Sequence, residues 1–301
     1  MNNKKIGLIV GDNPLHGISH LSQDRARARS LDGSVSNEEY ASRLVNLSLQ
    51  NGATGFMFSV SETTLSVLKA LPKDLKPELY AIVPYAYEYA RLATSAGGFS
   101  GLAKEIVRHI VFSRNIFAVA KDFLGIVHAD PSKLLKTYLI YEISRIRSAA
   151  GKNCNLASVM LHEILTDMAL AFNLDWLFRY YIDFLLKRHI QPGFETRNFA
   201  YLINKFEEWK ISLEEIAVVA PFNKAGFQMN PSKVACEKAL ANAAGAKIIA
   251  MSVLAAGYLK PVEAMEYLVN LPNISEIVVG VSKENQAKET FKLLKQSIGE
   301  E

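Results

Sequence analysis

The stretch that decides the fold runs from Lys247 to Thr290 and contains KIIAMSVLAAGYLKP at 247–261 and ISEIVVGVSKENQAKET at 274–290. Each of these segments contains a short apolar run, at 248–251 and at 277–279, that ends in a loop of small residues. Apolar runs of this length between turn signals are typical of parallel strands that are covered on both faces. We therefore predict two buried strands, each followed by a small-residue loop that leads into a helix.

The two loops after these strands are candidates for anion binding. Small residues let backbone N–H groups approach a ligand closely, and the N-terminus of a helix favours negative charge. If these strands are the last two of a barrel, their loops form the usual phosphate site of such barrels. The residues predicted to hold an anion are Ser252, Gly257, Gly280, Ser282 and Lys283. The alternative is tight packing of strand against helix, without a ligand.

Strand and helix signals alternate along the rest of the chain. Six more strands are predicted, at 6–10, 55–60, 79–83, 156–161, 189–194 and 216–220. Helices are predicted after the strands, including a single long helix at 166–187, and a helical insertion at 85–130 follows the third strand. Eight strand–helix units predict the α/β class and a (β/α)8 TIM barrel. No linker divides the chain, so we expect one domain, 1–301.

Composition and charge exclude several classes of protein. The formal net charge of +4 is spread along the chain without a dense Lys/Arg run, which argues against nucleic-acid binding. No apolar run reaches the ~18 residues that a membrane span requires. Cys154 and Cys236 lie far apart and indicate free thiols in a reducing compartment. Because no signal peptide is visible, we expect a cytoplasmic protein. The apolar insertion is a possible subunit contact in a homo-oligomer.

Five segments together resemble the aldo/keto reductase superfamily. SVLAAGYL at 252–259 is similar to the family's SPLxxGxL segment, and GVSKENQAKET at 280–290 is similar to GxSxxExLxEN. VMLHE at 159–163 matches the fourth-strand LxxH, GFETRNF at 193–199 matches GxSNF, and FSVSETTLSVLKAL at 58–71 has the shape of DTAxxYGxSExxLGxAL. The resemblance implies the barrel fold, with a nicotinamide nucleotide held by 252–259 and 280–290.

The chain departs from the family at the residues that carry its chemistry. The family uses an Asp, a Tyr, a Lys and a His, and of these only His162 is present here. Residues 56–58 are Phe-Met-Phe where the Asp is expected, no Tyr follows, and the third strand ends without a Lys. Carbonyl reduction needs a proton donor whose pKa is suitably lowered, in this family by the lysine. We therefore expect a divergent member that lacks the family's reductase route.

Candidate catalytic residues are the polar side chains at the carboxyl ends of the strands, where barrel enzymes place their chemistry. The predicted catalytic set is Asp12, His16, His162 and Glu163. The predicted binding set adds Asn13, Glu195, Arg197, Asn198 and Asn223 to the five anion-binding residues of the last two loops. Two alternatives stay open: His162 as a satisfied core histidine, and Arg197 as a partner in an ordinary salt bridge rather than an anion clamp.

We predict an enzyme that performs acid–base chemistry on a small anionic or phosphorylated metabolite, as a lyase, isomerase or hydrolase. One alternative is a divergent NAD(P)-dependent oxidoreductase with NADP as its cofactor. Another is a non-catalytic ligand-binding barrel. No metal-ligand motif is present, so no metal is predicted; a divalent metal, as the alternative, would use His16, His162 and Glu163.

Overall fold

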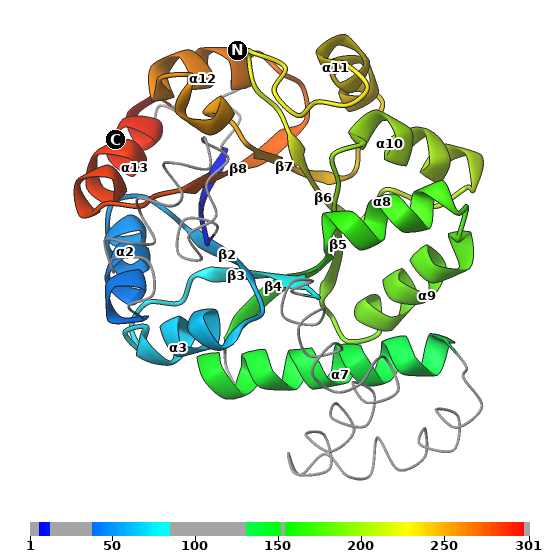
Figure 1. Cartoon of the computed structure of the whole chain (residues 1–301), viewed down its shortest axis with the longest axis horizontal. Coiled ribbons are helices and arrows are strands. Elements are labelled where there is room, and N and C mark those ends of the chain that lie inside the picture. The colour runs from blue at the N-terminus through cyan, green and yellow to red at the C-terminus, as the bar shows by residue number, and fades with distance from the viewer. Residues whose placement is uncertain (1–5, 13–37, 85–130, 152–153, 298–301) are drawn as a thin grey trace, which may run out of the picture.

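The computed structural model describes residues 6–12, 38–84, 131–151 and 154–297. In this part of the chain eight parallel strands close into a barrel in sequence order, and β1 pairs with β8 to complete it. Helices surround the strands on the outside (Figure 1). The predicted (β/α)8 TIM barrel is confirmed. The predicted helical insertion and most of the loop after the first strand lie outside the described residues.

The strands are short and lie close to their predicted positions. They are β1 (Gly7–Gly11), β2 (Gly55–Ser59), β3 (Glu78–Val83), β4 (Asn155–Leu161), β5 (Gln191–Glu195), β6 (Ala217–Pro221), β7 (Lys247–Met251) and β8 (Ile274–Gly280). The helices are α2 (Glu38–Gln50), α3 (Glu62–Ala70), α7 (Pro131–Ala150), α8 (Glu163–Ala171), α9 (Asp175–Leu186), α10 (Phe199–Glu208), α11 (Lys233–Ala241), α12 (Pro261–Leu268) and α13 (Glu284–Ser297), with a short 3-10 helix η2 (Ala255–Gly257) after β7.

The prediction of one long helix at 166–187 is wrong, because the chain forms α8 and α9 with a break between them. Asn173 in the break has a φ of 53°, in the left-handed region that ends a helix. Asparagine enters this region more readily than most residues. The N–H of Leu174 then donates to the carbonyl of Ala169 at 2.9 Å, which closes the turn.

The barrel interior is filled by apolar side chains at mid-height. The buried cluster there consists of Ile9, Met57, Tyr80, Ile82, Met160, Ala217, Val219, Ile249 and Met251. Gly193 makes room for it, since a Cβ at this position would lie 2.6 Å from Cγ of Met160. A filled centre of this kind is a core and not a channel, so polar side chains of the interior are confined to the two ends of the barrel.

The layer between strands and helices fixes which way β5 faces. Phe194 is fully buried in this layer. Its ring centroid lies 5.3 Å from that of Phe178 and 5.5 Å from that of Tyr181, both on α9. Because successive side chains of a strand point to opposite faces, this packing turns Glu195 toward the barrel interior.

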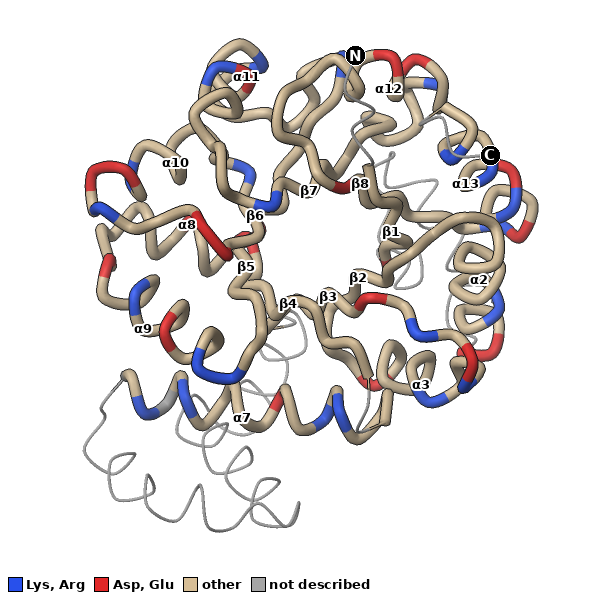
Figure 2. Tube along the Cα trace, turned by 180° about the vertical axis from the view of Figure 1, so that it is seen from behind, with Lys and Arg blue, Asp and Glu red and all other residues tan. Residues whose placement is uncertain are grey.

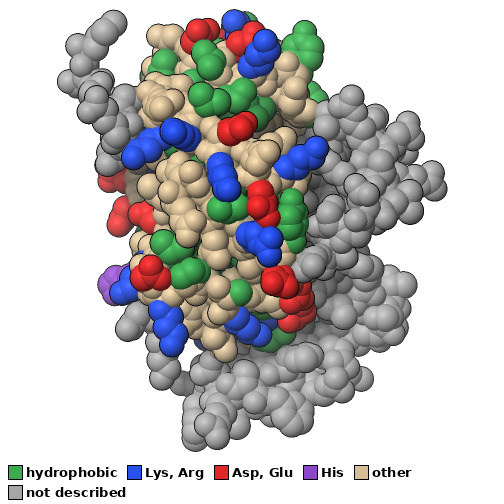
Figure 3. Space-filling model, turned by 90° about the vertical axis from the view of Figure 1, so that its left-hand side faces the viewer, with side chains coloured by type: hydrophobic (Ala, Val, Ile, Leu, Met, Phe, Trp, Pro, Cys, Tyr) green, Lys and Arg blue, Asp and Glu red, His purple; other side chains and the backbone are tan. Residues whose placement is uncertain are grey.

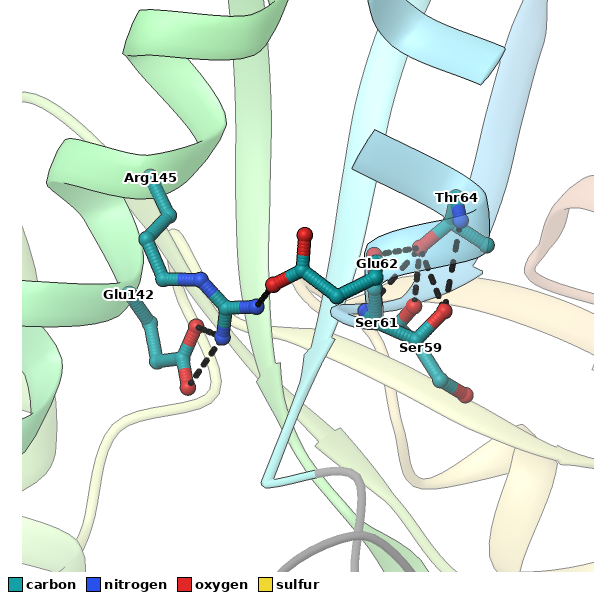
Figure 4. A network of polar contacts seen from close by, with 6 residues as sticks. All are labelled: Ser59, Ser61, Glu62, Thr64, Glu142 and Arg145. Carbon is teal, nitrogen blue, oxygen red and sulfur yellow. Dashed lines mark hydrogen bonds and ion pairs between the residues drawn. The ribbon is translucent and has the colours of Figure 1, made fainter. Parts of the chain in front are cut away.

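Charged residues lie mainly on the helices and loops around the barrel (Figure 2). On the flank formed by α2 and α13, cationic and anionic side chains are interspersed (Figure 3), and Arg43 pairs there with Glu284 at 3.2 Å. On another side, Arg145 of α7 joins Glu142 of its own helix to Glu62 of α3, at 3.0 and 2.6 Å (Figure 4). Among the described helices, none is both long and apolar enough to cross a membrane.

Candidate functional site

Three strands bring predicted site residues together at the carboxyl end of the barrel. β1 leads to Asp12, β4 to His162 and β5 to Glu195. In the parallel pairing of β4 with β5, Met160 is opposite Gly193 and Leu161 is opposite Phe194. The next positions along this register are His162 and Glu195, so these two side chains leave neighbouring strands on the interior side.

His162 is held in one orientation by the start of α8. It is the N-cap of this helix, and its Nδ1 accepts a hydrogen bond from the N–H of Ile164 at 3.2 Å. A ring whose Nδ1 accepts carries its proton on Nε2 when it is neutral. Burial lowers the pKa of His162, against the opposing effect of Glu163. At neutral pH His162 is therefore a neutral imidazole whose Nε2–H can donate.

Glu195 is a carboxylic acid that keeps its proton at neutral pH. Burial raises its pKa from an ordinary 4.5 to about 8, and the negative charges of Glu163 and Asp12 act in the same direction. The N–H of Glu163, which donates to Oε2 of Glu195 at 3.3 Å, and the charge of Arg197 oppose the shift. Because Oε2 accepts this backbone hydrogen bond, Oε1 is the oxygen left to carry the proton.

Arg197 forms the salt bridge that was one of its two predicted alternatives. Its Nε lies 2.7 Å from Oε2 of Glu163, and each side chain is about a fifth exposed. Arg197 also donates to the side-chain oxygen of Gln228, and the hydroxyl of Ser252 donates to the same oxygen at 3.4 Å. This chain of contacts joins the loops that follow β5, β6 and β7.

Asp12 connects β1 to β2 at the same end of the barrel. It is almost fully buried, and its Oδ2 accepts a hydrogen bond from the N–H of Ser59 at 2.7 Å. Its charge raises the pKa of both His162 and Glu195. Asp12 is therefore within electrostatic reach of both groups and adds negative charge to the mouth of the barrel.

Several hydrogen-bond donors of the loops after β7 and β8 already have acceptors within the protein. After β7, the N–H groups of Ala255 and Gly257 donate to carbonyls of the same loop at 2.8 Å. After β8, both the N–H and the hydroxyl of Ser282 donate to the side-chain oxygen of Gln286, at 3.2 and 3.1 Å. Gly280 and Lys283 are exposed. An anion bound by Ser282 would have to displace Gln286, so anion binding here stays a prediction.

The remaining predicted residues have local partners or lie elsewhere. Both amide atoms of Asn223 bond to the backbone of Phe227, at 2.8 and 2.9 Å, and so shape their own loop. The side chain of Asn198 donates to Asp167 at 2.9 Å. Asn13 and His16 lie outside the described residues. Within the described ranges, no group of three or more His, Cys, Asp or Glu side chains is arranged to hold a metal ion.

Asp167, which the sequence analysis did not single out, belongs to this part of the structure. It lies on α8 and accepts hydrogen bonds from the loop between β5 and α10. A signal was present in the sequence, because Asp167 follows Glu163 by four residues and a helix places such residues on one face. The signal was missed because the helix was predicted to begin only at residue 166, so Glu163 and Asp167 were not placed on the same helix.

A second polar cluster lies at the opposite, amino-terminal end of the strands. Nζ of Lys247 is 2.8 Å from a carboxylate oxygen of Glu276 and 3.6 Å from one of Glu78, and it donates to the hydroxyl of Tyr80 at 2.6 Å. The Tyr80 hydroxyl in turn lies 2.8 Å from Glu276 and 2.5 Å from Glu78. Burial and the two carboxylates raise the pKa of Tyr80 far above its ordinary range. This Tyr–Lys pair thus lacks the lowered tyrosine pKa that a reductase needs.

Comparison with known proteins supports the fold. No family model matches the chain, and no curated protein matches it. Two solved structures of a proposed aldo-keto reductase from Pseudomonas aeruginosa are similar, with TM-scores of 0.56 and 0.55. The closed eight-stranded barrel of this chain is thus similar in fold to these two structures. In both cases 97% of this chain and 90% of the other are covered at 10% identity, a level at which the likeness extends to the fold alone.

Apolar packing occupies the positions where the resemblance places the catalytic Asp. Phe56 and Phe58 are fully buried between the strands and the outer helices, with ring centroids 5.0 Å apart. Met57 points the other way, into the apolar interior cluster. This segment therefore serves the core.

Proposed function

We propose that the chain is an enzyme in which His162 and Glu195 move a proton on a small carbonyl metabolite. The observation that carries the proposal is their placement at corresponding positions of neighbouring strands: a neutral imidazole fixed by the backbone at the end of β4, and a carboxyl with a pKa of about 8 at the end of β5. Buried titratable groups with shifted pKa values at a barrel mouth are candidates for general acids and bases. We give the proton-transferring role to Glu195 rather than to Glu163, because Glu163 is paired with Arg197.

His162 and Glu195 together could catalyse an enolisation, in which a proton is removed from the carbon next to a carbonyl group. The Nε2–H of His162 would donate a hydrogen bond to the carbonyl oxygen of the substrate and stabilise the negative charge that develops there. Ionised Glu195 would take the proton from the carbon next to that carbonyl, and protonated Glu195 would return it to the same or a neighbouring carbon. A group with a pKa near the working pH can serve in both forms. This chemistry belongs to isomerases and to lyases.

The charges of the mouth favour one position for an anionic part of the substrate. Asp12 and Glu163 carry negative charge near β1 and β4, and Arg197 is paired with Glu163. A carboxylate or phosphate group would be repelled there and would lie toward exposed Lys283 after β8. We accordingly propose a substrate with a carbonyl at one end and an anionic group at the other.

Deuterium exchange tests the proton transfer without knowledge of the product. Small hydroxy-aldehydes, hydroxy-ketones and keto acids, each with and without phosphate, are incubated with the protein in D2O, and carbon-bound deuterium is measured by mass spectrometry. We expect exchange into at least one compound, reduced by about 10²–10⁴ in Glu195→Gln and in His162→Ala. Asp183→Asn, which removes an exposed carboxylate paired with Lys187 on α9, is the control and should exchange normally. Exchange unchanged in Glu195→Gln, or absent for every compound, contradicts the proposal.

Lys283→Gln tests the placement of the anion separately. The variant should raise KM for the phosphorylated compounds and leave KM for the uncharged compounds unchanged, because only the former need the cation. An equal effect on both sets would place the anionic group elsewhere.

A second candidate function is a divergent oxidoreductase that binds a nicotinamide nucleotide through 252–259 and 280–290. The likeness to the two solved aldo-keto reductase-type structures and the presence of His162 favour it. Quenching or a shift of NADPH fluorescence on addition of the protein would support nucleotide binding, and Ser282→Ala with Lys283→Gln should weaken it. An unchanged NADPH spectrum at high protein concentration would remove this candidate.

We also infer a cytoplasmic location. Cys154 and Cys236 are free thiols in the structure, and Cys236 is buried with its Sγ 3.2 Å from the carbonyl of Asn230. Unpaired cysteines are usual in reducing compartments.

A further inference from the structure

We propose that Asp167 is a positioning residue: it holds the loop Thr196–Asn198 against α8 so that Arg197 engages Glu163 and Glu195 stays at the barrel mouth. The inference rests on the proposed function of His162 and Glu195, and it names a residue that neither the sequence motifs nor the fold assigns.

The contacts of Asp167 occupy both of its carboxylate oxygens. Oδ1 accepts from the hydroxyl of Thr196 at 2.5 Å. Oδ2 accepts from the side-chain nitrogen of Asn198 at 2.9 Å and lies 3.4 Å from the backbone nitrogen of Arg197. Three successive residues after β5 are thus held by one side chain. Burial raises the pKa of Asp167, while these hydrogen bonds act in the opposite direction, as expected for a carboxylate stabilised by its donors.

The same helix carries the groups that Arg197 and Glu195 contact. α8 begins with Glu163, whose carboxylate is 2.7 Å from Nε of Arg197 and whose N–H donates to Glu195. Asp167 lies one turn further along this helix. Two successive turns of α8 therefore hold the loop after β5. Asp167 accepts from the side chains of Thr196 and Asn198 and from the N–H of Arg197, and Glu163 pairs with the side chain of Arg197. If Asp167 releases the loop, Arg197 loses the placement that brings it to Glu163.

The test reads the position of Arg197 directly, in the full-length protein and without any substrate. The Nε–H of Arg197 gives a 15N-resolved proton signal that Arg197→Lys identifies by its loss. In the wild type this proton should exchange more slowly than in the variants, because the ion pair with Glu163, at 2.7 Å, holds a side chain that is only about a fifth exposed. In Asp167→Ala we expect exchange to become at least about tenfold faster, because the restraint on the loop is lost. In Asp167→Asn, which keeps one acceptor oxygen, the change should be intermediate.

Glu142→Gln is the matched control. Glu142 is a fully buried carboxylate that holds Arg145 of α7 at the contact of α7 with α3, and among the described residues it makes no hydrogen bond or ion pair with the loop after β5 (Figure 4). Its variant should lower the thermal midpoint as Asp167→Ala does, yet leave the Arg197 signal unchanged. If Asp167→Ala does not fold, Thr196→Val, which removes the hydroxyl donor to Oδ1, takes its place and should also speed the exchange.

Two results would overturn the inference: unchanged Arg197 exchange in the folded Asp167 or Thr196 variant, or an equal acceleration in Glu142→Gln. Either is distinguishable from failure of the proposed function. Loss of substrate deuteration in every assay would remove the function and leave the Arg197 measurement intact. Normal deuteration with unchanged Arg197 exchange would leave the function and remove the positioning by Asp167.

Discussion

The two ends of the barrel each hold a cluster of charged side chains, and the clusters differ in how their charges are balanced. At the amino-terminal end, Lys247 lies between Glu78 and Glu276, and all three contact Tyr80. At the carboxyl end, the cation Arg197 faces Glu163, while other acidic groups lie nearby. The first arrangement has two carboxylates and one cation, and the Tyr80 hydroxyl joins all three in a network of direct contacts. The second leaves an acid with a pKa of about 8.

This difference separates a structural cluster from a candidate catalytic one. In a barrel of this kind, residues at the amino-terminal ends of the strands contribute to stability, and residues at the carboxyl ends carry the chemistry. Shifted pKa values occur at both ends, so a shift alone does not identify a site. The Tyr80 pKa is raised beyond any useful range, whereas Glu195 can exchange its proton near neutral pH. The following predictions test that distinction.

The largest effect is expected at the amino-terminal cluster. Lys247→Met leaves Glu276, which is 7% exposed, without its cation, and should lower the free energy of unfolding by roughly 3 kcal/mol at pH 8. Burial already raises the pKa of Glu276, and loss of Lys247 raises it further. When folding raises the pKa of a carboxyl group, the folded protein loses stability as the pH rises through that raised pKa. The defect of the variant should therefore be smaller at pH 5 than at pH 8. Urea unfolding at both pH values measures this.

A double variant provides the control for Lys247→Met. Lys247→Met with Glu276→Leu removes both charges and should recover most of the lost stability, because an apolar pair needs no counterion. If the double variant is as unstable as Lys247→Met, the defect comes from packing and not from the unpaired carboxylate.

The next effect concerns the pH dependence set by Glu195. In the folded protein this group keeps its proton up to about pH 8, and in the unfolded chain it loses it near the ordinary 4.5. Wild-type stability should therefore fall as pH rises from 5 to 8, by roughly 2–3 kcal/mol from this residue. Glu195→Gln should match the wild type at pH 5 and exceed it at pH 8.5 in urea unfolding. Parallel stability curves for the two proteins would show that Glu195 ionises normally.

The smallest effect is expected for Tyr80→Phe. The variant removes a hydroxyl that contacts Lys247 and both carboxylates but keeps the buried ring and the central cation. We expect a loss of about 1–2 kcal/mol. Deuterium exchange into substrates should be unchanged, since Tyr80 lies at the end of the barrel away from His162. A large loss of exchange would mean that the two ends do not differ as proposed.

The sequence was sufficient for the barrel because strands covered on both faces are continuous apolar runs. The eight runs between turn signals defined eight strands, and β8 alone begins clearly earlier than predicted, at Ile274. The break between α8 and α9 was not predictable in the same way. It contains neither Gly nor Pro, and a left-handed Asn173 ends the helix.

The location of these residues at the barrel mouth could be predicted from the ends of the strands, but their protonation states could not. The protonation of Glu195 depends on its burial, and the tautomer of His162 depends on the N–H of Ile164. Neither the burial of Glu195 nor the hydrogen bond to His162 can be inferred from the residue types alone. The amino-terminal cluster was not predicted at all, because Tyr80 and Lys247 are 167 positions apart and meet only once the barrel closes.

The most direct test of the account is a pH titration of Glu195 in the wild-type protein. The 13C signal of its side-chain carboxyl, assigned with Glu195→Gln, is followed by NMR from pH 4 to 10. The groups that act on it are Glu163, Asp12 and Arg197, and with burial they should give a midpoint near 8. A midpoint near the ordinary 4.5 would contradict the claim that the carboxyl end of the barrel holds a proton-transferring acid.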